Sequence, residues 1–291
     1  MSYVSVISRA QPGCLIIMLD QSGSMSLPWG DAGQSKAEVL ADIVNELVAS
    51  AVVRSTSGDS VRDYFEVGVV GYGDTKITDV FQASNAPGPS TQLSLHPISQ
   101  VALMPKRIED RVQIVEDRFG NTHEAPYKMP IWVEPQSSGG TPMCAALGAV
   151  VATAASWTAR HPDSYPPLVF NVTDAASTDG DPTPLAGALT SLSTQDGAAL
   201  LFNIHVSESA RGSVVFPQNT DAIHNDAYAV MLYQLSSILP PAMVRAAQEA
   251  GMQAGPLSRG FAHNADPASL VEVLDIGTAP LLGDQIKIHR P

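Results

Sequence analysis

The chain is poor in cysteine and in basic residues, and it lacks long apolar runs. Its 291 residues include two cysteines, so we expect neither a disulfide framework nor a cysteine-based zinc site. Lysine and arginine number 16 against 29 aspartate plus glutamate, which gives a formal net charge of −13. Such a charge repels phosphate backbones and anionic lipid, so neither nucleic acid nor a membrane is an expected partner. No stretch reaches the roughly eighteen apolar residues typical of a membrane-spanning helix.

Two further absences concern location and catalysis. Residues 1–11 lack a basic segment followed by a long apolar one, so no signal peptide is recognised and a cytoplasmic location is expected. The chain has no Walker phosphate loop, no His-Glu-x-x-His motif and no Gly-x-Ser-x-Gly elbow. The histidines at positions 161, 205, 224 and 263 are scattered along the sequence and form no catalytic pattern. We therefore expect a protein without enzymatic activity.

What the chain does contain is an alternation of apolar runs and helical patterns. Hydrophobic residues make up 44% of the sequence and charged residues 15%, which suits a globular core. Strands are predicted over residues 14–19, 65–71, 168–172 and 198–206. Helices are predicted over residues 35–54, 141–157, 185–192, 236–250 and 269–274. This alternation predicts an α/β fold with a doubly wound, mostly parallel sheet and helices on both faces.

Two segments depart from the alternation. Residues 75–81 are predicted to form one antiparallel edge strand, because the Gly73-Asp74 turn connects them to the strand before. Residues 83–136 are rich in proline and have only short apolar runs. No repeat is evident, and no linker separates two composition regimes. We therefore interpret residues 1–291 as a single domain that carries a proline-rich insertion around residues 83–136.

The most informative stretch is residues 15–25, where an apolar run ends abruptly in a carboxylate. Asp20 is followed by two hydroxyls, those of Ser22 and Ser24, and Gly23 lets the turn tighten. A loop that leaves the carboxyl end of a buried parallel strand lies where open α/β sheets bind ligands. Oxygen ligands without sulfur or imidazole suit Mg²⁺ or Mn²⁺ better than Zn²⁺. The stretch therefore predicts a divalent metal site.

This stretch resembles the metal-ion-dependent adhesion site of the von Willebrand factor type A (VWA) domain, whose pattern is Asp-x-Ser-x-Ser. Taken alone, such residues more often form turns and helix caps. The family completes its site with a distant threonine and a distant aspartate. This sequence has both in the same order, Thr141 in the string SGGTPM and Asp174 at the end of the string VFNVTD. Three separated matches in the right order favour the metal site over three unrelated turns.

The resemblance also implies a role for each residue. Ser22 and Ser24 would bind the ion directly, Thr141 would bind it directly or through water, and Asp20 and Asp174 would act largely through waters. One coordination position would stay open for an aspartate or glutamate of a partner protein. The expected function is thus that of a protein-interaction module that depends on Mg²⁺ or Mn²⁺.

The last aspartate of the site has an alternative. Asp174 is followed by Ala175-Ala176, whereas many relatives have glycine there, and the string TDGDPT carries a second copy of the usual pattern with Asp179. Asp179 is therefore a possible alternative metal residue. We prefer Asp174 because it ends an apolar strand, which holds it rigidly.

The threonine loop, with its following Ala145-Ala146-Leu147, looks most like that of bacterial intracellular VWA proteins related to tellurium resistance. Such proteins are often encoded beside a serine/threonine kinase and a protein phosphatase, so the resemblance implies an adaptor in stress-response signalling. The competing hypothesis is a Mg²⁺-dependent phosphohydrolase that uses Asp20 as nucleophile or metal ligand. It ranks second because Gln21 and Ser22 follow where a second carboxylate is usual.

Overall fold

A central mixed sheet organises the molecule. The computed structural model describes residues 3–29, 33–81, 93–116, 122–207, 212–223 and 225–282. The strands of the sheet are β1 (Gly13–Asp20), β4 (Phe65–Gly73), β5 (Lys76–Asp79), β6 (His96–Pro97), β9 (Leu168–Thr173), β10 (Leu200–Val206), β11 (Val214–Val215) and β12 (Phe261–Ala265). Their order is β11-β12-β10-β9-β1-β4-β5, with β6 also pairing with β4. From β12 to β4 the neighbours are parallel, whereas β5, β6 and β11 are antiparallel.

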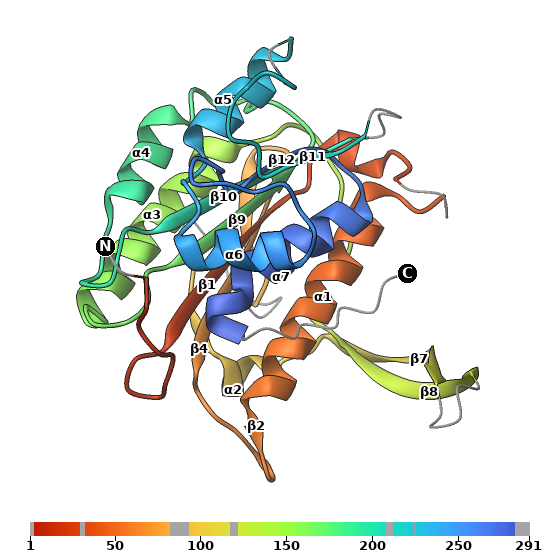
Figure 1. Cartoon of the computed structure of the whole chain (residues 1–291). Coiled ribbons are helices and arrows are strands. Elements are labelled where there is room, and N and C mark those ends of the chain that lie inside the picture. The colour runs from red at the N-terminus through yellow and green to blue at the C-terminus, as the bar shows by residue number, and fades with distance from the viewer. Residues whose placement is uncertain are drawn as a thin grey trace.

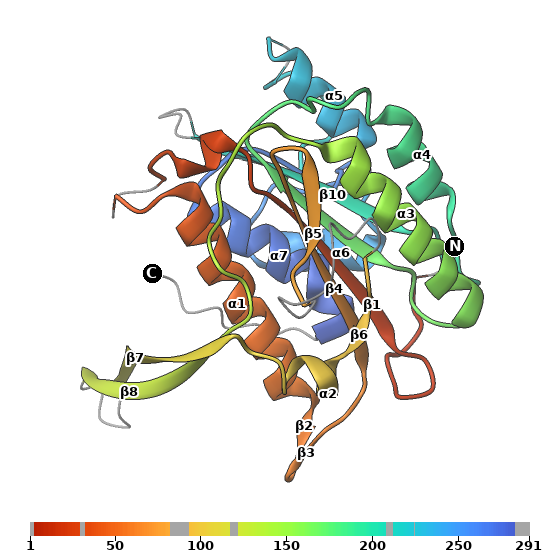
Figure 2. The ribbon, with the colours of Figure 1, turned by 180° about the vertical axis from the view of Figure 1, so that it is seen from behind.

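Helices cover both faces of this sheet (Figures 1 and 2). They are η1 (Gly23–Ser26, a 3₁₀ turn), α1 (Lys36–Ser55), α2 (Ile98–Val101), α3 (Met143–Arg160), α4 (Thr183–Ser191), α5 (Ala227–Leu235), α6 (Pro241–Glu249) and α7 (Pro267–Leu282). Successive side chains of a strand point to opposite faces. In β1, Leu15 and Ile17 belong to the core under α1, α6 and α7, whereas Ile16 and Met18 belong to the core under α3 and α4. The predicted fold class is confirmed.

The start of α1 is set by a capping box. The Ser35 side chain accepts a hydrogen bond from the backbone N–H of Glu38, and the Glu38 carboxylate accepts one from the backbone N–H of Ser35 at 2.8 Å. This reciprocal pair satisfies two donors that a helix start would otherwise leave unpaired. As a result, Lys36 is the first residue of the helix.

Most predicted elements are present, with shifted ends. The predicted edge strand is β5, which pairs antiparallel with β4. The helix predicted over residues 236–250 begins only at Pro241, since proline suits the first position of a helix and not its interior. The sequence did not predict α5 or β12. In β12 the polar pair His263-Asn264 interrupts the apolar run, which hides the strand from pattern analysis.

The described part of the proline-rich segment has regular structure that the sequence did not predict. It includes β6, α2 and a hairpin of β7 (Arg107–Glu116) and β8 (Thr122–Ile131), which extends away from the sheet (Figures 1 and 2). At its base, the Asn45 side chain of α1 accepts hydrogen bonds from the backbone N–H groups of Trp132 and Val133. Pro126 and Pro130 are tolerated because a two-stranded ribbon has open edges where no further N–H is needed. Residues 83–92 and 117–121 of the predicted insertion lie outside the described residues.

Two smaller features complete the fold. A short ribbon of β2 (Thr56–Ser57) and β3 (Ser60–Val61) follows α1. Within the described ranges, no helix is both long enough and apolar enough to cross a membrane.

Candidate metal centre

The candidate site lies where the strand order of the sheet reverses. Parallel strands β1 and β9 are neighbours, and their register pairs Leu19 with Val172. Asp20 and Asp174 therefore leave the sheet at the same edge, at the carboxyl ends of the two strands. From β1 the sheet continues through β4 on one side and through β9, β10 and β12 on the other. This reversal is the place where open α/β sheets bind ligands.

The carboxylate of Asp20 is buried and held in place. Asp20 is only 1% exposed to solvent. Oδ1 accepts a hydrogen bond from the backbone N–H of Ser22 at 2.8 Å, and Oδ2 accepts one from the Thr173 hydroxyl at 2.6 Å. Burial raises the pKa of Asp20, although the hydrogen bonds from Thr173 and Ser22 oppose that shift. A nearby cation would stabilise the charged form of this carboxylate.

A chain of hydrogen bonds joins the two serines to the distant aspartate. The hydroxyls of Ser22 and Ser24 lie 3.1 Å apart. The Ser24 hydroxyl then donates to Oδ1 of Asp174 at 2.6 Å, across 150 positions of sequence. The structure thus brings Asp20, Ser22, Ser24 and Asp174 together, as the sequence predicted for the members of one site.

The Thr141 loop is tied to the loops around it by backbone hydrogen bonds. The N–H of Gly23 donates to the carbonyl of Gly139 at 3.0 Å, which links the serine loop to the threonine loop. The N–H of Thr141 donates to the Thr178 hydroxyl, and the N–H of Thr178 donates to the Thr141 carbonyl, both at 2.9 Å. Thr141 is buried in this arrangement. Its loop therefore meets both the loop after β1 and the loop after β9.

A glycine makes this close approach of loops possible. Gly139 has a φ of +62°, a conformation that favours glycine. A Cβ atom at Gly139 would also lie 2.5 Å from the backbone of Asp74, in the turn between β4 and β5. The Gly-Gly before Thr141 is thus explained in part by packing against a neighbouring turn.

Asp179 faces a different part of the molecule. Its carboxylate accepts hydrogen bonds from the backbone N–H groups of Cys144 at 3.0 Å and Ala145 at 2.9 Å, in the first turn of α3. The Ser177 hydroxyl donates to it as well, at 2.8 Å. Burial alone would raise the pKa of Asp179, but these hydrogen bonds lower it below its ordinary value. Asp179 therefore acts as a cap of α3, while Asp174 accepts a hydrogen bond from Ser24.

Sequence analysis missed one charged residue of the site, Lys36. Its Nζ lies 2.9 Å from Oδ2 of Asp174, and the two side chains are only 6% and 2% exposed. A basic residue in the first turn of a helix is unusual, because the amino end of a helix dipole is positive. That mismatch was the signal available in the sequence.

Buried polar side chains connect the strands close to the site. Tyr72 of β4, which is in register with Asp20, donates its hydroxyl to Oδ1 of Asn171 at 2.6 Å. Nδ2 of Asn171 donates to Oδ1 of Asn203 at 3.0 Å, and Asn203 continues to the Ser236 hydroxyl at 3.0 Å. Satisfied networks of this kind specify one arrangement of a core. This network fixes β4, β9 and β10 relative to one another.

Two of the histidines that are scattered in the sequence are stacked in the structure. The rings of His205, on β10, and His263, on β12, have centroids 5.0 Å apart. Burial, followed by the charge of His263, lowers the pKa of His205 to about 4, so His205 is neutral at pH 7. Tyr228 of α5 packs edge-on against His205. Burial is the main cause that raises the pKa of Tyr228, and the charges of Asp20 and Asp174 raise it further. The pair escaped sequence analysis because β12 was not predicted, and His224 lies outside the described residues.

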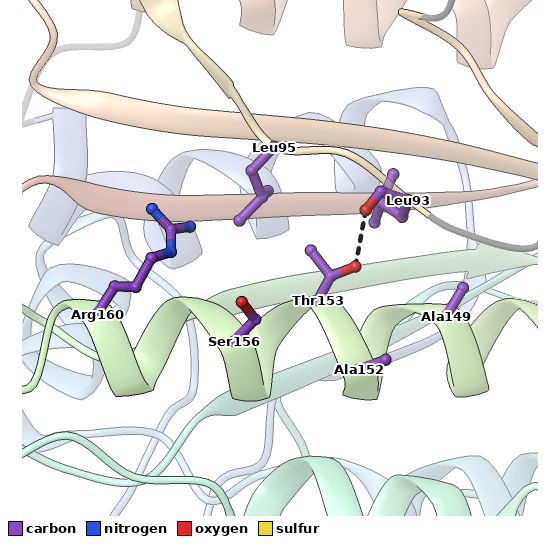
Figure 3. A pocket seen from close by; sticks show the side chains of 7 residues that line it. All are labelled: Leu93, Leu95, Ala149, Ala152, Thr153, Ser156 and Arg160. Atoms are coloured by element: carbon purple, nitrogen blue, oxygen red, sulfur yellow. Dashed lines mark hydrogen bonds between the residues drawn. The ribbon is translucent and has the colours of Figure 1, made fainter.

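Two pockets in the described part of the chain lie away from this site. One, of ≈ 350 Å³, lies between α3 and the segment of Leu93 and Leu95, and its lining comprises Leu93, Leu95, Ala149, Ala152, Thr153, Ser156 and Arg160 (Figure 3). In this pocket the Thr153 hydroxyl donates to the carbonyl of Leu93 at 2.8 Å. Another, of ≈ 530 Å³, lies between α1 and the base of the β7–β8 hairpin. Neither pocket includes Asp20, Ser22, Ser24 or Asp174, whose polar atoms are in contact with one another instead.

Comparison with known proteins identifies the fold but no close relative. No family model matches the chain, and no curated protein sequence matches it either. The pilus adhesin SpaC from Lactobacillus rhamnosus GG superposes with a TM-score of 0.50 at 12% identity, covering 96% of this chain and 31% of that one. The chain has a VWA fold. A manganese-loaded TRAP protein from Plasmodium vivax gives a TM-score of 0.42 at 13% identity, covering 94% of this chain and 74% of that one.

In this VWA fold the candidate site offers hard oxygen donors with little charge. Within the ranges that the structure describes, no group of three or more His, Cys, Asp and Glu residues is placed to hold a metal ion. The donors at the site are two carboxylates and the serine hydroxyls, which suit a hard cation that keeps part of its water shell. Two observations fit a cation here: burial raises the pKa of Asp20, and the ammonium of Lys36 already contacts Asp174.

Proposed function

We propose that this chain is a metal-dependent protein-interaction module. Its ligand set for Mg²⁺ or Mn²⁺ would comprise Asp20, Ser22, Ser24, Thr141 and Asp174. The ion would take up an aspartate or glutamate carboxylate of a partner protein. The observation that carries the proposal is the hydrogen-bonded chain from Ser22 through Ser24 to Asp174, which unites two loops from the central strands.

The residues of the site have distinct tasks in this proposal. The backbone N–H of Ser22 and the Thr173 hydroxyl orient Asp20. Ser24 orients Asp174 through its hydroxyl. When bound, the ion supplies the positive centre that a partner carboxylate needs. Without it, an approaching carboxylate meets Asp20 and Asp174, which carry the same charge. A protein with a net charge of −13 therefore depends on a cation to attract an acidic partner.

Asp174 is the preferred last ligand in place of Asp179. Both oxygens of Asp179 accept hydrogen bonds from the first turn of α3, so they are already used in capping. Both oxygens of Asp174 have partners as well, but these are Ser24 and Lys36, which lie within the candidate site. This orientation supports Asp174 as the last ligand. Its position at the end of a buried strand supports the same choice.

A binding experiment with Mn²⁺ tests the ligand set. Electron paramagnetic resonance of free Mn²⁺ should show one bound ion in the wild type, and no binding in Asp20→Ala or in Ser22→Ala/Ser24→Ala. The matched control is Asp181→Ala, since Asp181 lies in the neighbouring loop and caps α4 through the N–H of Thr183. Wild-type protein that binds no Mn²⁺ at millimolar concentration, or binding that survives Asp20→Ala, would reject the site.

The open coordination position has its own test. The proton relaxation rate of water in contact with bound Mn²⁺ should fall when an aspartate-containing peptide displaces a bound water. The same peptide with asparagine in place of aspartate serves as the control. Partner capture from a lysate should likewise need the ion and fail in EDTA. Equal relaxation with both peptides would argue against uptake of a carboxylate.

The competing hydrolase hypothesis has less support from the geometry. Both oxygens of Asp20 accept hydrogen bonds, and the residue is 1% exposed, so a nucleophilic attack from Asp20 would first require those contacts to break. A phosphoester screen with Asp20→Asn as control distinguishes the two functions.

For the cellular role, the likeness of the threonine loop to bacterial intracellular proteins supports a cytoplasmic adaptor in stress-response or kinase/phosphatase-linked signalling.

A further inference from the structure

Lys36 is a buried cation inside a site that is proposed to bind a cation. It is the first residue of α1, directly after the cap residue Ser35. Its ammonium lies 2.9 Å from Oδ2 of Asp174, and its side chain is 6% exposed. The other oxygen of the same carboxylate accepts the hydrogen bond from Ser24. Asp174 is therefore shared between a serine of the candidate site and a lysine.

The helix does not explain why a lysine occupies this position. The amino end of a helix favours negative charge, and α1 already has Glu38 there, whose pKa is lowered by hydrogen bonds from Ser35. Burial of an ammonium is costly unless a carboxylate accompanies it. The buried and negatively charged Asp174 meets that need. The placement of Lys36 is thus explained by the candidate metal site and not by helix formation.

We propose that Lys36 is a resident competitor of the divalent ion for Asp174. This inference rests on the proposed function. An ion held by the hydroxyls of Ser22 and Ser24 carries two positive charges close to Asp174, and the Lys36 ammonium repels it. Lysine has a long flexible stem, so its ammonium can withdraw when the ion binds. Lys36 therefore neutralises the site without metal and lowers its affinity for the ion.

The same competition links metal to partner. A partner carboxylate brings negative charge to the site, which offsets the repulsion between the ion and Lys36. Bound metal should therefore raise the affinity for the carboxylate, and bound carboxylate should raise the affinity for the metal by the same factor. The site would then hold its ion firmly only when the acidic partner is present.

Mn²⁺ titrations of purified variants test the role of Lys36. We expect the dissociation constant of Lys36→Met to be lower than that of the wild type by roughly tenfold or more, because a charge at close range is removed. Lys36→Arg keeps the charge and should bind no more tightly than the wild type. Lys36→Gln is a second neutral variant that can still donate a hydrogen bond to Asp174, in case methionine impairs folding.

The matched control is Lys128→Met. It changes the net charge equally, but Lys128 lies on the β7–β8 hairpin with its side chain 70% exposed. The affinity of Lys128→Met for Mn²⁺ should equal that of the wild type. If Lys36→Met and Lys36→Gln bind Mn²⁺ no more tightly than Lys128→Met, the competition is refuted while the metal site stands. If neither the wild type nor any variant binds Mn²⁺, the proposed function fails, and the inference about Lys36 fails with it.

Discussion

The ion pair between Lys36 and Asp174 should be strongly coupled in the stability of the metal-free protein. Asp174→Asn removes the carboxylate but keeps a similar shape, so the Lys36 ammonium stays buried without that counter-charge. Lys36→Met removes the ammonium, and Asp174 then keeps only part of its support, including the hydrogen bond from Ser24. The double variant removes both charges at once.

The size of the effect follows from the burial of the pair. The two side chains are 6% and 2% exposed, so solvent screens them little. Removal of one partner of a buried pair costs about 3–5 kcal/mol, because the remaining charge has lost its hydration. We expect this cost for Asp174→Asn, which corresponds to a drop in Tm of roughly 6–20 °C for a protein of this size. Lys36→Met should cost less, because Asp174 still accepts a hydrogen bond.

Urea unfolding in EDTA measures the free energies of unfolding for the wild type, both single variants and the double variant. The double variant should lose less stability than the sum of the single variants by about 2 kcal/mol or more. Lys128→Met combined with Asp174→Asn is the control pair, and its effects should add. Additive losses in Lys36→Met/Asp174→Asn, within about 0.5 kcal/mol, would refute the idea that the two charges stabilise one another.

Three further predictions concern other parts of the molecule. Asp179→Ala should lower the free energy of unfolding by about 1 kcal/mol through loss of the α3 cap and leave Mn²⁺ affinity unchanged; a loss of Mn²⁺ binding would restore Asp179 as a ligand. Burial raises the pKa of Glu46 to about 7 from 4.5, so the folded state binds this proton more tightly and its stability falls as the pH rises from about 4.5 to 7. Glu46→Gln should reduce that decline by about 1 kcal/mol after allowance for solvent screening, measured by urea unfolding at pH 5 and pH 8. His205, with its pKa lowered to about 4, should show no protonation above about pH 5 in an NMR titration, and a transition near pH 6.5 would contradict its burial.

The elements closest to the site were the most predictable. The strands β1, β4, β9 and β10 are continuous apolar runs, and such runs identify buried parallel strands without knowledge of their neighbours. Asp20, Ser22 and Ser24 were found because they form a short motif after a strand, whereas Thr141 and Asp174 were found through the resemblance to the VWA pattern. The hairpin β7–β8 was missed because its prolines and charges hide the alternation, and β12 was missed because His263 and Asn264 interrupt it.

Other features of the site depend on contacts between distant segments. Lys36 and Asp174 are 138 positions apart, and no local pattern relates them. The choice between Asp174 and Asp179 is similar, since both follow the same strand and both suit a turn. Only the folded loop shows that Asp179 faces the amide groups of α3 while Asp174 faces Ser24.

The sequence by itself determined the class of fold and the donors of the candidate site. Strand and helix formation follow from the spacing of apolar residues, and the kind of metal expected at the site follows from the oxygen donors that the sequence offers, so both expectations rest on local properties. Tertiary structure alone decided which carboxylate faces Ser24, how the Thr141 loop is tied to its neighbours, and that an ammonium occupies the site. The physical reason is that ion pairs and caps depend on direction and distance through space. These are set by the register of β1 against β9 and by the packing of α1 and α3 on opposite faces of the sheet.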